Sequence, residues 1–495
     1  MIRFILVPLF TAAFLGQSSF VAASPPATPA PLSGQWKGPL KLLGGQIGIT
    51  ITIVPLTNGT YYAALDAPQQ RISRMPVDVE LKGTDLQLRI EQAGSSFVGK
   101  VSNGGATLTG TWKQPGVTSP MVLKRVAASA RAVTKFKATP PYRETDVSFV
   151  NPVTKSRIGG TLTVPAGTGP FPAVVLLSDS GPQNRDVEVT GYRMFGQLSD
   201  YLTRHGVAVL RFDDRGVGKS SGTYTSATTA DFVTDARAAL SYLRGRPLIS
   251  SHRVGLLGHG EGANVALLAA ATPGQTPAFV VSLAGYGQPG AEVLLRQQGE
   301  IMRLIGADPA QVQAARDVYQ STVDVIRQTP DNTLARAKVA TLLNGTNTGL
   351  DVGMARARAV QLTTPWSRYF FDFNPQSQLS KVQCPVLLLN GTADLQVSAK
   401  RNMAPLARAL RRAHRPVASY RLTGLNHFFQ TAPAQWPIVN GVQQPTFAPE
   451  ALKLIYSWVA RETKMPDDQL PLTVKRRAAP GKKTRPVASA SHRRS

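Results

Sequence analysis

The sequence contains few cysteines, few histidines and few acidic residues, and each shortage excludes a class of protein. The single cysteine, Cys384, allows neither an intramolecular disulfide framework nor a Cys-based zinc site. A count of only six histidines argues against a His-rich metal cluster, and we expect no metal and no cofactor. Because hydrophobic residues make up 42% of the 495 residues and charged residues only 17%, wholesale disorder is excluded, and the length predicts two or three domains.

The shortage of acidic residues leaves a net charge of +26, from 55 Lys and Arg against 29 Asp and Glu. Such a balance suggests an anionic partner, for example nucleic acid or a membrane surface. Eight basic residues and no acidic residue lie within residues 474–495, among Ala, Pro and Ser, which predicts a disordered basic tail over residues 463–495. The tail either binds an anionic envelope polymer or lipid, or it is simply solvated. No nucleic-acid-binding motif accompanies it, so we expect no nucleic-acid partner.

Long apolar runs are also absent, except at the N-terminus. Residues 4–16 are nearly all apolar, follow Arg3 and precede the small-residue pattern Val21-Ala22-Ala23. This is typical of a secretory signal peptide over residues 1–23, because the run is shorter than the about 20 residues that a membrane span needs. An uncleaved anchor is the alternative. The signal peptide predicts a secreted or periplasmic protein with no transmembrane segment in the mature chain.

Alternation of apolar and polar residues predicts a domain of β-strands over residues 34–125. In the segment Ile49–Ile53, for example, isoleucine and threonine alternate. Similar runs with turn signals between them predict a meander of about six to eight short strands, which forms a small barrel or a sandwich. Trp36 and Trp112, near the two ends of this domain, either close its core or offer a platform for a ligand.

A second domain is predicted over residues 143–462, after a linker at residues 126–142 that lacks periodicity. Short apolar runs separated by helical segments predict a mostly parallel sheet with helices on both faces, which makes the fold class α/β. The apolar runs are residues 173–177, 207–212, 254–257, 279–283, 386–389 and 417–422. At about residues 286–380 the alternation stops, and we expect a helical insertion where a lid would cover the carboxyl ends of the strands.

One strand of this sheet runs directly into Gly258-His259-Gly260-Glu261-Gly262, and a helix follows. A strand, two flanking glycines and a helix are the setting of a nucleophile elbow, whose middle residue is normally serine. The glycines are needed because a sharp turn brings the strand and the helix backbones together. The middle position here is Gly260, which has no side chain and therefore no nucleophile.

The other members of a catalytic triad follow in the expected chain order. Asp394 lies on a loop just after one predicted strand, and His427 lies on the loop after the last one. A carboxylate in such a position can orient a histidine, and the histidine can then act as a general base at the elbow. Either residue alone would be a weak signal, but the ordered set predicts a hydrolase-type site.

Several of these segments together resemble the secreted bacterial α/β-hydrolases of the dienelactone-hydrolase and serine-aminopeptidase-like group. The resemblance covers about residues 143–462, and its motifs are residues 178–186, 211–218, 258–262, 390–395 and 424–428. The small β-domain also resembles one that often precedes such hydrolases. The resemblance implies an α/β-hydrolase fold with a helical lid and a carboxylic ester hydrolase acting on an ester or acyl ligand.

The same resemblance assigns roles to individual residues. It makes Asp394 the acid of the triad and His427 the base, and the backbone N–H groups of Glu261 and Ser180 would form the oxyanion hole. The sequence departs from the family pattern twice. Gly260 replaces the expected serine, so no acyl-enzyme can form there. Asp179 stands where glycine is usual, and an ionised carboxylate near the hole would disfavour a developing oxyanion.

Three other groups of residues have two interpretations each. Asp213-Asp214-Arg215 is either an acid/base pair or a turn held by a carboxylate–Arg pair. Trp366, Tyr369, Phe370 and Phe371 either line an acyl pocket or pack the insertion on the core. Ser178 and Ser180 are the nearest hydroxyls by motif, but neither lies on an elbow, which argues against a substitute nucleophile.

Two functions compete on this reading. In the first, the protein still hydrolyses esters with a water activated by Asp394 and His427, because loss of one triad member typically leaves roughly 10³–10⁴-fold acceleration over water. In the second, it is a pseudoenzyme that binds a ligand or a partner. An anion-binding role through the tail is a third possibility.

Overall fold

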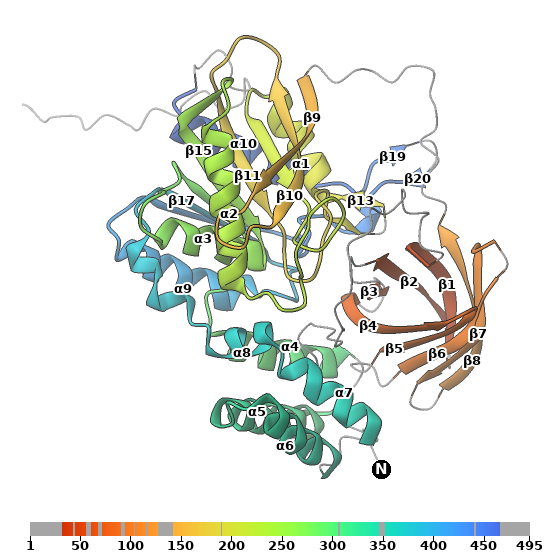
Figure 1. The fold of residues 1–495 in the computed structure, drawn as a ribbon. Coiled ribbons are helices and arrows are strands. Elements are labelled where there is room, and N and C mark those ends of the chain that lie inside the picture. Colours follow the sequence, from red (N-terminus) through yellow and green to blue (C-terminus); the bar gives the residue numbers. More distant parts are fainter. Residues whose placement is uncertain are drawn as a thin grey trace, which may run out of the picture.

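The computed structural model describes residues 32–465 apart from short internal gaps. The gaps are residues 43–44, 56–60, 68–71, 91–94, 103, 115–116, 127–141, 190, 305–306, 346–351 and 440–441. The predicted signal peptide, nearly all of the predicted linker and the predicted tail from residue 466 onward lie outside the described residues. Figure 1 shows a β-barrel, an α/β domain and a group of helices inserted in the latter.

The first domain is a closed barrel of eight strands and not a sandwich. Its strands are β1 (Gly34–Leu42), β2 (Gly45–Pro55), β3 (Tyr61–Ala67), β4 (Ile72–Lys82), β5 (Asp85–Ile90), β6 (Ser95–Val101), β7 (Thr107–Gln114) and β8 (Val117–Val126). Each strand is antiparallel to the next, and β8 returns to pair with β1. The predicted alternation places one face of each strand inside, so that Ile49, Ile51 and Ile53 are at most 2% exposed.

Trp36 and Trp112 both belong to the barrel core. They are 0% and 2% exposed, and the indole N–H of Trp36 donates to the carbonyl of Leu32 at 3.0 Å. Buried in this way, the two rings fill the core and do not form a ligand platform.

The second domain contains a sheet of eight strands in the order β18-β17-β16-β15-β11-β14-β10-β9. The strands are β9 (Tyr142–Val150), β10 (Arg157–Pro165), β11 (Phe171–Leu177), β14 (Ala208–Phe212), β15 (Ile249–His259), β16 (Val280–Leu283), β17 (Val386–Gly391) and β18 (Val417–Leu422). The six strands from β11 to β18 are mutually parallel, and they match the six predicted apolar runs. The antiparallel pair β9 and β10 was not predicted.

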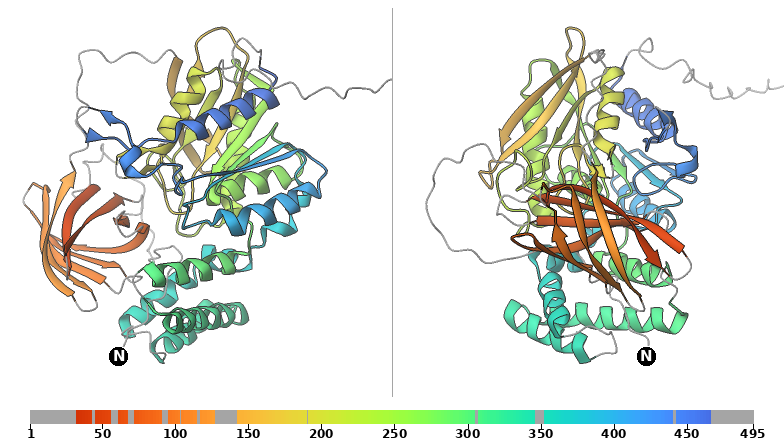
Figure 2. Two further views of the ribbon diagram at one scale, coloured as in Figure 1. Left: turned by 180° about the vertical axis from the view of Figure 1, so that it is seen from behind. Right: turned by 90° about the vertical axis from the view of Figure 1, so that its right-hand side faces the viewer.

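Helices cover both faces of this sheet. The helices are α1 (Met194–Arg204), α2 (Thr229–Arg244), α3 (Glu261–Ala271), α9 (Ala399–Arg411) and α10 (Pro449–Glu462). Figures 1 and 2 show α1 and α10 together on one face, with α2 and α3 on the other. Two short hairpins, β12 (Glu188–Val189) with β13 (Tyr192–Arg193) and β19 (Ile438–Val439) with β20 (Val442–Gln443), lie outside the sheet. None of the described helices is long and apolar enough to cross a membrane.

Five helices are inserted between β16 and β17, within the segment predicted to be helical. They are α4 (Gly290–Leu304), α5 (Pro309–Gln328), α6 (Asn332–Gly345), α7 (Val352–Leu362) and α8 (Pro365–Asp372). The apolar face of α5 is buried, as its 3.6-residue period predicts, and Tyr319, Val323 and Ile326 are each 1% exposed. The insertion also meets the barrel, where the Gln361 amide donates to the Asp78 carboxylate at 3.4 Å.

Candidate active site

The motif Gly258–Gly262 forms a sharp turn between a strand and a helix, as its spacing predicts. Strand β15 ends at His259, Gly260 has φ 53° and ψ −116°, and α3 begins at Glu261. A Cβ on Gly258 would lie 1.9 Å from the carbonyl oxygen of Gly262, and a Cβ on Gly262 would lie 2.2 Å from that of Leu177. Only glycine fits at either flank, because the backbones of the strand, the helix and the neighbouring β11 touch there.

The space beside Gly260 is filled by a carboxylate from another strand. Asp179 follows the end of β11, and a Cβ built on Gly260 would lie 1.9 Å from Asp179 Oδ1 and 2.2 Å from its Cγ. Any side chain at position 260 would therefore collide with Asp179. The two departures from the family pattern form one structural feature, a carboxylate placed where the elbow side chain would project.

The two backbone N–H groups predicted to form an oxyanion hole do converge, but on this carboxylate. The N–H groups of Glu261 and Ser180 donate to Asp179 Oδ1 at 2.8 and 2.7 Å. Such donors stabilise negative charge, and here the charge already belongs to the protein. These two N–H groups therefore do not form a free hole for a substrate oxyanion. The sequence predicted that an ionised Asp179 near the hole would repel a developing oxyanion. The structure places the Asp179 carboxylate inside the hole itself.

His427 connects Asp179 to Asp394. Its Nε2 lies 2.9 Å from Asp179 Oδ2, and its Nδ1 lies 2.8 Å from Asp394 Oδ2. Asp394 Oδ1 in turn accepts the backbone N–H groups of Gln396 and Val397, both at 2.8 Å, which orient the carboxylate. The imidazole thus lies between two buried carboxylates, and Asp179 makes the contact that a serine hydroxyl would make with Nε2.

Burial and the neighbouring charges set the protonation states of His427 and Asp179. Burial lowers the pKa of His427, but the charges and hydrogen bonds of Asp394 and Asp179 outweigh burial and raise it to about 10. Burial raises the pKa of Asp179, but the hydrogen bond and charge of His427 outweigh it and hold that pKa well below its usual range. At neutral pH Asp179 is therefore a carboxylate and His427 an imidazolium.

A second buried histidine lies beside the trio and was given no role by sequence reasoning. His259 Nε2 lies 2.8 Å from the carbonyl oxygen of His427, so it carries the proton, and Nδ1 has no hydrogen-bond partner in the described residues. Burial and the charge of His427 lower the pKa of His259 to about 4, so this ring is neutral. Asp179, His259 and His427 each offer a ligand atom within 4.8 Å of the others, so these three described residues form a donor set that could hold a metal ion. The sequence signal that could have pointed to His259 is its position directly before Gly260, the elbow glycine.

Two further buried carboxyl groups flank the turn. Glu261 Oε1 accepts from Thr229 Oγ1 at 2.6 Å and from the indole N–H of Trp366 at 2.8 Å, and burial raises the pKa of Glu261 to about 7. Asp214 accepts from Ser178 Oγ at 2.6 Å and from the backbone N–H of Gln183. Burial raises the pKa of Asp214 to about 8. These two groups and Asp179 line one pocket, with Phe212, Tyr224, Phe232 and Val265 as apolar wall.

The aromatic residues of α8 pack against the core. Trp366 stacks on Phe370 with ring centroids 4.7 Å apart, and both side chains are at most 4% exposed. Through its bond to Glu261, Trp366 also ties the insertion to the start of α3. Packing is thus the interpretation that the contacts support, rather than an acyl pocket.

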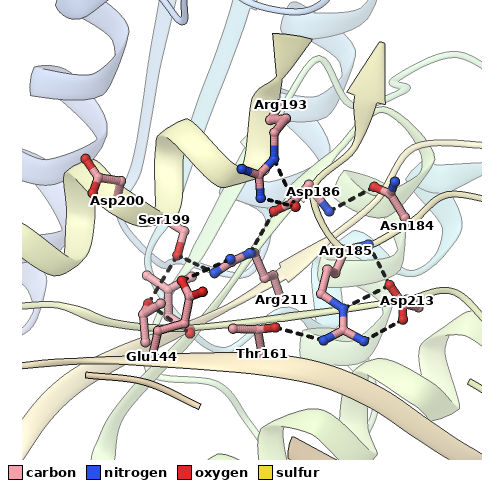
Figure 3. A network of polar contacts seen from close by, with 12 residues as sticks. Glu144, Thr161, Asn184, Arg185, Asp186, Arg193, Ser199, Asp200, Arg211 and Asp213 are labelled. Atoms are coloured by element: carbon pink, nitrogen blue, oxygen red, sulfur yellow. Dashed lines mark hydrogen bonds and ion pairs between the residues drawn. The ribbon is translucent and has the colours of Figure 1, made fainter. Parts of the chain in front are cut away.

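The turn after β14 is held by arginine, but not by the arginine within it. Asp213 receives two hydrogen bonds from the Arg185 guanidinium, at 3.0 and 2.6 Å (Figure 3). Arg215 instead pairs with Asp235 at 2.8 Å. Arg211 pairs with Asp186 in the same network. The turn is therefore structural, and its pairs join segments that are distant in the sequence.

Asp214→Asn is expected to stabilise the protein at alkaline pH. A carboxyl group whose pKa is about 8 in the folded protein and ordinarily 3.8 contributes stability below pH 4 that is lost as the pH rises through 8. The amide avoids this loss, and the Ser178 hydroxyl can rotate to accept from it. We expect the free energy of unfolding at pH 8 to rise by about 1–3 kcal/mol. Urea unfolding at pH 5 and pH 8 measures it, and an equal difference at both pH values would contradict the assignment.

Together, the parallel sheet, the strand–turn–helix elbow and the histidine between two carboxylates define an α/β-hydrolase. The sequence profile of the X-Pro dipeptidyl-peptidase (S15) family matches residues 156–427, which is more than half of the chain. The chain belongs to this family.

Individual relatives agree with a hydrolase of the α/β type. The esterase EstD of Thermotoga maritima is 27% identical over 184 residues, which cover 37% of this chain and 43% of the esterase. Human acyl-coenzyme A thioesterase 1 is 28% identical over 178 residues, covering 35% of this chain and 38% of the thioesterase. The chain thus matches less than half the length of these curated relatives. A solved esterase of Pyrococcus furiosus is similar with a TM-score of 0.42 and 16% identity, over 66% of this chain and 94% of that one.

Proposed function

We propose that this protein is an exported member of the carboxylic ester hydrolase lineage in which serine-type ester hydrolysis has been lost. The observation that carries the proposal is the position of the Asp179 carboxylate. It lies where the elbow side chain would be, accepts hydrogen bonds from the two N–H donors, and contacts Nε2 of His427. Gly260 supplies no hydroxyl. Even with a serine at position 260, Asp179 would still occupy the two N–H donors and the Nε2 atom of His427.

The neighbouring hydroxyls do not replace the missing serine. Ser178 Oγ donates to Asp214, and Ser180 Oγ lies 3.4 Å from Asp179 Oδ1. A serine nucleophile needs the imidazole to take its proton, and the imidazole nitrogen that would do so faces Asp179. We therefore assign no nucleophilic role to either hydroxyl.

The site still has the form of a ligand pocket. The names of the relatives, an esterase and acyl-coenzyme A thioesterases, support an ester or acyl group as the ligand class. The second candidate is a pseudoenzyme that only binds such a ligand, and the closed trio of Asp179, His427 and Asp394 favours it because all three side chains are buried and paired. The helical insertion would act as the lid. The basic tail would contact an anionic envelope surface.

The native protein is expected to resist serine-directed reagents. Because no serine lies at the elbow and the N–H donors are engaged, a fluorophosphonate probe should not label the chain, and short-chain aryl esters should be hydrolysed no faster than by His427→Ala. Gel fluorescence and release of the aryl alcohol measure both. Stoichiometric labelling, or ester turnover that disappears in His427→Ala, would show that serine chemistry persists.

A further inference from the structure

Asp179 itself meets three conditions of a nucleophile at this turn. Its carboxylate lies where the elbow side chain would be, one oxygen is held by two backbone N–H groups, and the other faces the imidazole. We propose that Asp179 is the nucleophile of this site and that it displaces a leaving group from a saturated carbon, so that the protein hydrolyses alkyl electrophiles such as alkyl halides or sulfonate esters. The inference rests on the proposed loss of serine chemistry and names what the same site does instead.

The occupied hole selects this class of substrate. Attack on an ester carbonyl places negative charge on a substrate oxygen, and the donors that would stabilise it are bound to Asp179 Oδ1. A carboxylate is also a far better leaving group than an alkoxide, so its attack on an ordinary ester would reverse. Displacement at a saturated carbon puts the developing charge on the departing group, and it needs no hole for the substrate.

The first step forms a covalent ester. Asp179 Oδ2 donates an electron pair to the saturated carbon, the bond from that carbon to the leaving group breaks, and the leaving group departs with the bonding pair as an anion. The pKa of Asp179, held low, keeps the carboxylate ionised and ready for this attack at neutral pH. Asp179 becomes a neutral alkyl ester.

The second step uses the rest of the site. Once Asp179 is neutral, one of the two charges that hold the proton on His427 is gone, and the imidazolium releases that proton to solvent. Neutral His427, oriented by Asp394, then removes a proton from a water that attacks Asp179 Cγ. The oxyanion develops on Oδ1, where the N–H groups of Glu261 and Ser180 already point. When the intermediate collapses, the bond from Cγ to the alkyl oxygen breaks, the alcohol takes the remaining water proton, and the carboxylate and imidazolium are restored.

The surroundings combine apolar and polar groups. Asp179 lines a pocket whose wall contains Phe212, Tyr224, Phe232 and Val265 for an alkyl group, beside the polar Ser178, Asp214, Arg215, Asp235 and Glu261. Gly260 has no Cβ, so the carboxylate can lie against the turn without a steric conflict. The glycine is thus what this nucleophile requires.

The test is a single turnover in 18O-labelled water with the full native chain. n-Hexyl bromide, chloride and methanesulfonate serve as probes, with protein in molar excess over each. Water attacks Asp179 Cγ, so the first hexanol should carry unlabelled oxygen, and tryptic peptide 158–185 should gain one 18O. Asp179 is the only carboxylate side chain in that peptide. Labelled hexanol with an unlabelled peptide would mean direct attack by water, and it would overturn the proposal.

Two variants make the result decisive. His427→Gln should accumulate the hexyl ester, visible as a hexyl mass increase on peptide 158–185, because the base for the second step is missing. The matched control Asp179→Asn keeps the shape but not the nucleophile, and it should form neither adduct nor hexanol. If the native chain forms neither hexanol nor adduct with all three probes, the proposal is wrong whether or not the variants fold. Fluorophosphonate labelling of the native chain would instead refute the loss of serine chemistry.

Discussion

Replacing Asp179 by glycine and Gly260 by serine in one chain is expected to create a serine esterase. Asp179→Gly frees the N–H groups of Glu261 and Ser180, and Gly260→Ser supplies a hydroxyl that His427 can deprotonate. Since removal of a triad member typically lowers kcat by 10⁴-fold or more, we expect aryl-ester hydrolysis at least about 10³-fold above the native level. Release of the aryl alcohol measures it, together with new labelling by a fluorophosphonate.

Neither single variant should do this. In Gly260→Ser the new Cβ would lie 1.9 Å from Asp179 Oδ1, so the carboxylate must move and the protein loses stability. Asp179→Gly opens the hole but has no nucleophile. The double variant with alanine at 260 matches the size of the active one without its hydroxyl, and should be inactive. Backbone strain at φ 53° costs about 1–3 kcal/mol for a residue other than glycine, which a stable chain tolerates. Equal activity in the serine and alanine versions would refute the elbow assignment.

Removing the imidazole is expected to be the most destabilising change at the site. His427→Ala leaves the buried Asp179 and Asp394 carboxylates without the cation between them, and breaking a buried pair in this way costs about 3–5 kcal/mol. Urea unfolding at pH 6 measures the loss. Adding Asp179→Asn to His427→Ala should recover part of it, because one of the two uncompensated charges is then removed. A loss below about 1 kcal/mol would show that the trio is not charged as described.

The pH dependence of this loss has a definite sign. The pKa of His427 in the folded protein, about 10, lies above its ordinary value of 6.5. The stability that this group contributes is therefore complete below pH 6.5 and is lost as the pH rises through 10. The pKa of Asp179 in the folded protein lies below its ordinary value of 3.8, so its contribution to stability is present above pH 3.8 and is lost as the pH falls further. The difference between native and His427→Ala is therefore largest at about pH 4 to 6.5.

In the second domain, the sequence predicted the strands that contain a mainly apolar run and missed the two that do not. Five of the six parallel strands contain a buried apolar run, whereas β18, at one edge of the sheet, is half-buried to exposed. Strand β9 is mostly exposed at the edge of the sheet, and β10 contains Gly159, Gly160 and two buried threonines. Neither strand forms an apolar run, so the same criterion could not find them. The barrel was predicted only as a barrel or a sandwich, because alternation defines strand faces and not closure.

Charged pairs between distant segments were predicted less well. One interpretation of the sequence was a turn held by a carboxylate–Arg pair at Asp213-Asp214-Arg215, but the arginine that binds Asp213 is Arg185, on a loop 28 residues earlier. Sequence reasoning assigned no role to His259, because its neighbourhood depends on the loop that carries His427, 168 residues away.

The sequence alone determined where the elbow, the histidine and its carboxylate partner lie, because each follows a strand that its own composition reveals. It also showed both departures, Gly260 and Asp179. Only the tertiary structure decided that the two are one feature. They are 81 positions apart, just after the ends of β15 and β11, and the parallel pairing of these strands brings their ends together. The direction of the Asp179 side chain follows from the N–H groups and the imidazole that surround it, which no local pattern specifies. That packing fills the place of the missing serine with a carboxylate.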